Sequence, residues 1–129
     1  MMKRRTCLQS ALGIAALAAA RGAGGQHPIE LHVELSVNPA KEREMLDLFH
    51  NAFRPAAGRQ PGFIEAKMLK FDAAKRGDPP AGNYRFVLLF QSEEQRQAWV
   101  ATPEHQKIWP MILATLTKPE YTAILYEPA

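Results

Sequence analysis

The chain has 129 residues, 47% of them hydrophobic and 22% charged, and this length allows one domain at most. Its net charge of +3 comes from the N-terminal segment, because residues 26–129 carry 12 basic and 13 acidic side chains. This balance gives no support for nucleic-acid binding, which needs a basic face on the folded domain, and a single cysteine, Cys7, excludes a disulfide framework.

Residues 1–25 have the three parts of a signal peptide. Arg4 and Arg5 give the segment a positive start, an alanine-rich apolar run covers residues 11–20, and small residues follow. The run is shorter than the roughly 20 apolar residues that a membrane span needs. The adjacent arginines resemble the twin-arginine export pattern. We therefore expect residues 26–129 to be exported, to the periplasm or beyond, without remaining in the membrane; a helical or disordered N-terminal arm is the alternative.

The first elements of the domain are a predicted strand and a predicted helix. Apolar and polar side chains alternate over residues 27–37, which is typical of a strand with one face on a core. Asn38 and Pro39 then provide a helix cap and a proline at the first helical position. Apolar residues recur at three- and four-residue spacing from Ala40 to Ala57, so we predict a helix there.

A turn, a strand, a loop and another strand follow. Pro61 and Gly62 end the helix and turn the chain. Residues 63–71 are predicted to form the second strand, and residues 72–82, with two prolines and two glycines, to form a loop. Residues 84–91 are rich in aromatic and branched side chains and are predicted to form a buried third strand.

The C-terminal part repeats the helix and strand of the first part. Ser92 opens a capping box, and Thr102 followed by Pro103 starts a second helical piece, so the helix is expected to be in two parts. Residues 121–126 are predicted to form the fourth strand. The order is β-α-β-β-α-β with an antiparallel sheet, which is the ferredoxin-like plan of the α+β class.

Two short motifs in this order resemble the antibiotic biosynthesis monooxygenase family of the dimeric α+β barrel superfamily. They are Pro61-Gly62-Phe63 at the second strand and Trp99-Val-Ala-Thr-Pro-Glu-His105-Gln106 in the last helical part. The resemblance implies a homodimer whose two sheets form a barrel, with a pocket between sheet and helices in each subunit. Some members oxygenate phenolic or quinol substrates with dioxygen and need no metal or flavin. Others degrade haem, and many have no known reaction.

His105 is the candidate catalytic residue. Oxygenation without a cofactor needs a base that makes an electron-rich phenolate or enolate, in a cavity that excludes water. His105 falls in the first turn of the last helix, where the positive end of the helix dipole keeps an imidazole neutral. The competing interpretation is that the ring bonds the local backbone as part of a helix cap.

Five other side chains are candidates to bind a small aromatic ligand. Trp99, Trp109 and Tyr84 are expected to supply aromatic walls. His50 and Asn51, late in the first helix, are candidates to hold a substrate oxygen. The structural alternatives are that the tryptophans belong to the core and that His50 and Asn51 are solvated.

No metal or other cofactor is predicted. Glu30, His32 and Glu34 share one strand face, but successive residues of a face stand about 7 Å apart, too far to hold one ion comfortably. Ion pairs with Lys67 or Arg85 inside a dimeric barrel are the favoured interpretation. The haem-degrading relatives have their ligating histidine ten residues beyond the tryptophan of the last motif, where this chain has another tryptophan.

Three functions stay open on the sequence. The chain is a cofactor-independent monooxygenase acting on a small quinol- or phenol-like substrate, a dimeric barrel that binds a small ligand without turnover, or a structural dimer without a pocket. The aromatic residues and the histidine around the last helix favour a pocket.

Overall fold

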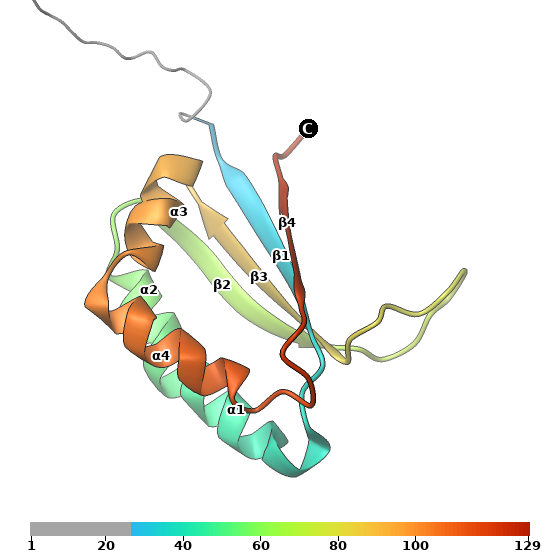
Figure 1. Cartoon of the computed structure of the whole chain (residues 1–129). Coiled ribbons are helices and arrows are strands. Elements are labelled where there is room, and N and C mark those ends of the chain that lie inside the picture. The colour runs from blue at the N-terminus through green and yellow to red at the C-terminus, as the bar shows by residue number, and fades with distance from the viewer. Residues whose placement is uncertain (1–26) are drawn as a thin grey trace, which may run out of the picture.

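The computed structural model describes residues 27–129, so the predicted signal peptide, residues 1–25, lies outside the described part of the chain. Four antiparallel strands form a sheet in the order β2-β3-β1-β4, and the helices pack on one face of it (Figure 1). The strands are β1 (Ile29–Leu35), β2 (Phe63–Lys70), β3 (Tyr84–Phe90) and β4 (Thr122–Tyr126). This arrangement confirms the predicted ferredoxin-like plan.

Two helical segments connect the strands. The first consists of a 3₁₀ turn η2 (Pro39–Lys41), α1 (Glu42–Leu48), a π-helical turn η3 (Phe49–Phe53) and α2 (Arg54–Gly58). The second consists of α3 (Glu93–Val100) and α4 (Pro103–Leu113). None of these helices of residues 27–129 is long and apolar enough to cross a membrane.

The π-helical turn in the first segment has a cause in the sequence. Pro55 has no N–H to donate to the carbonyl of Asn51, and its ring would collide with that carbonyl in a regular helix. The turn before it is widened, and the Arg54 N–H donates to the carbonyl of Phe49, five residues back. Phe49 and Phe53 are both buried, with stacked rings 5.9 Å apart.

The second segment is divided where the sequence predicts. The Ser92 hydroxyl accepts a hydrogen bond from the Gln95 N–H at 3.2 Å and caps α3. The Thr102 hydroxyl accepts one from the His105 N–H at 3.2 Å and caps α4. These two caps satisfy N–H groups that the first turn of a helix leaves free.

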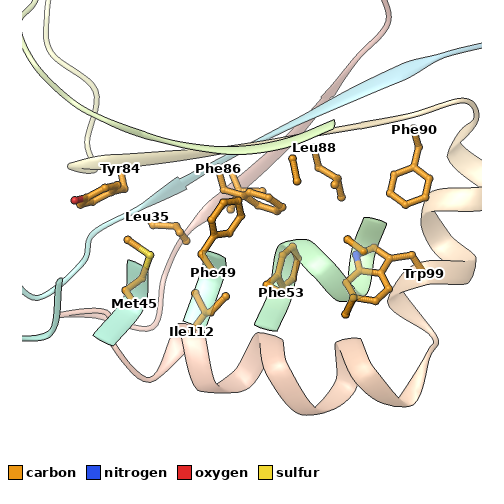
Figure 2. Close-up of a cluster of buried hydrophobic side chains, with 14 of the residues drawn as sticks. Leu35, Met45, Phe49, Phe53, Tyr84, Phe86, Leu88, Phe90, Trp99 and Ile112 are labelled. Atoms are coloured by element: carbon orange, nitrogen blue, oxygen red, sulfur yellow. The ribbon is translucent and has the colours of Figure 1, made fainter. Parts of the chain in front are cut away.

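The core lies between the sheet and the helices. Side chains of β1 and β3 that point to the helices pack against Phe49, Phe53 and Ile112, which lie below them in Figure 2. Trp99 is 1% exposed and belongs to this core, which confirms the structural interpretation of that residue. The alternation of the first strand is confirmed by the burial of Ile29, Val33 and Leu35.

The sheet face away from the helices carries the acidic row of β1. Glu34 stands opposite Arg85 of β3 and forms an ion pair with it, as expected. Glu30 accepts a hydrogen bond from the His32 ring at 2.7 Å. Within residues 27–129, no group of three histidine, aspartate or glutamate side chains is placed to hold one metal ion.

Candidate functional site

A pocket of about 340 Å³ lies between the sheet and α4. Its floor is apolar and comes from Leu31 and Val33 of β1 and from Phe86 and Leu88 of β3. Pockets for small molecules span roughly 300–1,000 Å³, so this one has room for a ligand of one or two fused rings.

Aromatic rings from three elements gather around His105 at this pocket. Its ring lies 5.1 Å from that of Trp99, 5.9 Å from that of Phe53 and 6.1 Å from that of Trp109, centroid to centroid. His105, Phe53 and Trp109 line the pocket, whereas Trp99 supports the His105 ring from the core. The structure thus brings together His105 and both predicted tryptophans.

The His105 ring is held neutral. Burial lowers its pKa from 6.5 to about 4, and the positive charge of Arg96 adds to this effect. Its Nδ1 atom is buried and has no hydrogen-bond partner among the described residues. The Thr102 N–H, which a capping side chain at His105 would have to accept from, donates to the Trp99 carbonyl at 3.0 Å, so the structure does not support the interpretation of the His105 ring as a cap.

Arg96 is a pocket residue that the sequence does not single out. Its Nε and Nη2 atoms each donate to the Glu93 carboxylate at 2.7 Å. An arginine three residues after a glutamate is typical of the exposed side of a helix, and the sequence offers no reason to place it at a site. A sequence signal for Arg96 is its four-residue spacing from Val100, which places both side chains on one face of α3. Both residues line the pocket.

The mouth of the pocket is formed by α4 and by the chain that leads into β4. The Trp109 indole N–H approaches the Tyr121 hydroxyl at 3.5 Å, and the two rings meet edge-on at 6.0 Å. Pro110 lies beside them and cannot donate a helical hydrogen bond to the Gln106 carbonyl. Tyr121 is not predicted as a site residue, because its segment has the pattern of an ordinary strand.

Tyr84 lies away from the pocket, at the opposite end of the inward face of β3 from Phe90. Its hydroxyl donates to the Glu42 carboxylate, to which Lys70 is paired at 2.8 Å. Burial and the hydrogen bond to Glu42 raise the pKa of Tyr84 to about 12. These contacts tie α1 to the sheet. The surroundings of Tyr84 therefore indicate a role in stabilising the fold and not in lining the pocket.

His50 and Asn51 are exposed and do not line the pocket. Phe49 and Phe53, four residues apart, both point into the core, which leaves His50 and Asn51 on the outer side of the segment. The burial of these two rings decides which face of the segment meets the sheet.

The chain matches the family model described as antibiotic biosynthesis monooxygenase over residues 28–109. No curated protein sequence matches it. Its fold is similar to that of a conserved protein from Methanosarcina mazei Go1, with 14% identity and a TM-score of 0.65 over 81% of this chain and 95% of that one.

Two further solved structures are similar. SnoaB, a cofactor-independent oxygenase from Streptomyces nogalater, in a mutant form, has 17% identity and a TM-score of 0.60 over 78% of this chain and 92% of that one. A Caulobacter crescentus CB15 protein, provisionally assigned as an antibiotic biosynthesis monooxygenase, has 17% identity and a TM-score of 0.65 over 84% of this chain and 95% of that one.

Proposed function

Because the chain belongs to the antibiotic biosynthesis monooxygenase family, we propose that it is a cofactor-independent monooxygenase that oxidises a small phenol- or quinol-like aromatic substrate. The observation that carries the proposal is a neutral imidazole, His105, at the wall of an apolar, aromatic pocket. The structural similarity to SnoaB supports the same class of chemistry.

In this proposal His105 receives the proton of a substrate hydroxyl and thereby makes an electron-rich oxyanion. The oxyanion transfers electrons to dioxygen, and one oxygen atom becomes bonded to a ring carbon while the other leaves as water. A phenol that becomes a quinone in this way supplies all four electrons that reduce dioxygen, and its hydroxyl and ring hydrogens leave in the water, so no external reductant is needed. The apolar floor and Trp109 keep water from the reacting carbon.

The base role requires one tautomer of His105. Since Nδ1 is buried, the lone pair that receives a proton from the ligand must be on Nε2, and the ring hydrogen must be on Nδ1. That hydrogen then faces the surrounding rings, among them Trp99, which is perpendicular to His105 at 89°. Among the residues that the structure describes, no acceptor bonds to Nδ1, so that hydrogen makes at most a weak contact with a ring.

One observation favours a second function, a ligand-binding module without turnover. The Trp99 indole nitrogen is also buried without a partner among the described residues. An indole N–H only donates, so a bond from it to Nδ1 of His105 would place the ring hydrogen on Nε2. His105 would then donate to a bound ligand and could not act as a base. The ¹⁵N chemical shifts of the His105 ring at neutral pH separate the two tautomers.

The proposal includes export of the protein and pairing of two copies through the open face of the sheet. Arg4 and Arg5 with the apolar run of residues 11–20 support export, and replacing both arginines by lysine should leave the protein in the cytoplasm if the twin-arginine route is used. Ile124 and Tyr126, both about half exposed on β4, support an interface on that face.

The test is oxygen uptake by the purified protein with a panel of quinols, anthrones and flavonoid-like phenols. We expect uptake that resists a metal chelator and that falls at least a hundredfold in His105→Phe, which keeps the ring packing but removes the base. His50→Phe, an exposed histidine outside the pocket, is the matched control and should retain full activity. Uptake that survives in His105→Phe, or that the chelator abolishes, contradicts the proposal.

A further inference from the structure

We propose that the pocket recognises an anionic oxygen of its ligand through the guanidinium of Arg96. The ligand class is then a flat aromatic or enolic anion, such as a nitrophenolate, a hydroxyquinone anion or the enolate of a cyclic 1,3-diketone. The inference concerns the same pocket as the proposed function, but it rests on binding and not on turnover.

The charge of the pocket lining favours an anion. Among the described residues that line the pocket, Arg96 is the only one with a formal charge, and none is acidic. The floor is made of aliphatic and aromatic side chains, which cannot stabilise an ion of either sign. A cation at the wall of an apolar pocket whose lining holds no acid favours a ligand that carries one negative charge, because the attraction is strong where water is scarce.

The hydrogen-bond geometry of Arg96 leaves donors for such a ligand. Glu93 occupies the edge of the guanidinium formed by Nε and Nη2. A guanidinium has five N–H donors in a fixed fork, so both hydrogens of Nη1 and the second hydrogen of Nη2 remain. Those three hydrogens lie on the two edges that Glu93 does not occupy. Glu93 thus fixes the orientation of the guanidinium and leaves three of its five N–H donors for a ligand.

Glu93 does not cancel the charge of Arg96 inside the pocket. Glu93 is not part of the pocket lining, whereas Arg96 and His105 both are. The positive charge of Arg96 contributes to the lowered pKa of His105, so its influence reaches that ring although Arg96 is paired with Glu93. His105 itself is neutral, so Arg96 is the cation that an anionic oxygen in the pocket would meet.

The acidity of the ligand follows from the weakness of His105 as a base. A simple phenol has a pKa of about 10, about six units above that of His105, and proton transfer between them would be unfavourable by about a millionfold. Arg96 offsets part of this difference, because its positive charge stabilises the oxyanion that forms when the proton leaves. The pair of residues therefore favours a hydroxyl group more acidic than that of an ordinary phenol.

A dye that changes colour on ionisation tests the inference. 4-Nitrophenol titrates near neutral pH, its anion is yellow, and its methyl ether, 4-nitroanisole, has the same shape without an ionisable group. We expect the protein to bind the anion and to lower the pKa of the bound dye by about one unit, which is a tenfold preference for the anion. In Arg96→Met that preference should disappear while 4-nitroanisole binds as before.

Three further variants distinguish a loss of anion recognition from a loss of folded protein. Glu93→Gln leaves Arg96 without its carboxylate and should bind the anion at least as tightly as the unaltered protein. Arg96→Lys keeps the charge but not the fork and should retain part of the preference. Arg54→Met removes a comparable pair, Arg54 with Glu65 at 2.8 Å, outside the pocket, and should change nothing in dye binding.

The outcomes also separate the inference from the proposed function. Anion binding without oxygen uptake by any substrate would leave the anion site in place and contradict the monooxygenase. Oxygen uptake that Arg96→Met leaves unchanged would overturn the anion site alone. Equal affinity for 4-nitrophenolate and 4-nitroanisole, a folded Arg96→Met protein that keeps the preference, or no dye binding at all would overturn it as well.

Discussion

At the scale of single residues, the sequence identifies His105 but not the charge beside it. A histidine in the first turn of a predicted helix, four residues before a tryptophan, is a pattern that a sequence shows directly. Arg96 comes to the pocket because the chain turns between α3 and α4, and that turn sets which face of α3 looks at the sheet. The spacing between Arg96 and Val100 shows that they share a helix face, but not that this face meets a pocket.

The depressed pKa of His105 makes the stability of the fold depend on pH. The folded protein keeps the ring neutral down to about pH 4, whereas the unfolded chain takes up a proton below about 6.5, so acid favours unfolding. Allowing for the partial exposure of the ring, we expect the free energy of unfolding to fall by about 1 kcal/mol more between pH 7 and 5 in the unaltered protein than in His105→Phe. Urea unfolding at both pH values measures this, with His50→Phe as control; equal losses in all three proteins would contradict it.

We expect the two tryptophans of the last motif to have different roles, Trp99 in the core and Trp109 in the pocket. Trp99→Ala removes a fully buried side chain and should cost about 3–5 kcal/mol of unfolding free energy. Trp109 is partly exposed at the pocket mouth, so Trp109→Ala should cost clearly less but weaken the binding of 4-nitroanisole at least tenfold. Chemical denaturation and dye titration of both variants test this. A Trp109→Ala protein with full affinity would show that the ring only covers the core.

At the scale of elements, caps and alternation could be predicted from the sequence, whereas the π-helical turn could not. Ser92 and Thr102 act on N–H groups three residues away, and a strand face needs only a period of two. The widened turn at residues 49–53 depends on Pro55 and on how much the core gains from two buried phenylalanines. Such a balance involves the whole molecule, and the sequence alone does not show that Phe53 reaches the pocket whereas His50 and Asn51 do not.

Thr102 connects an element boundary to the site. Its hydroxyl accepts from the His105 N–H and donates to the Trp99 carbonyl at 2.7 Å. Thr102→Ala should therefore cost about 1 kcal/mol of unfolding free energy and also displace His105, whereas Thr102→Ser should restore both. Ser92→Ala removes the other cap and should cost a similar amount without changing dye binding. If the two alanine variants weaken binding equally, the link between cap and site is wrong.

At the scale of the whole molecule, one sheet face is covered by helices and the other is open (Figure 1). The open face combines the Glu34–Arg85 ion pair with exposed apolar side chains of β4. If two copies pair there, Ile124→Lys should convert a dimer to a monomer, because burying an unpaired charge is costly. Met111→Lys, at an exposed apolar position on α4, is the control. Light scattering after size exclusion measures the mass; a monomer in the unaltered protein would contradict the pairing.

The outer wall of the pocket has a consequence for how a ligand enters. Tyr121 and Ala123 belong to the last part of the chain, where β4 is an edge strand, hydrogen-bonded only to β1, and all its residues are exposed. Edge strands with little burial open locally more often than central ones. The amide hydrogens of β4 should therefore exchange with solvent faster than those of β3, and a bound ligand should slow that exchange. If this edge detaches when a ligand passes, the rate of that opening sets how fast the ligand arrives and leaves, and the exchange of the β4 amides measures it.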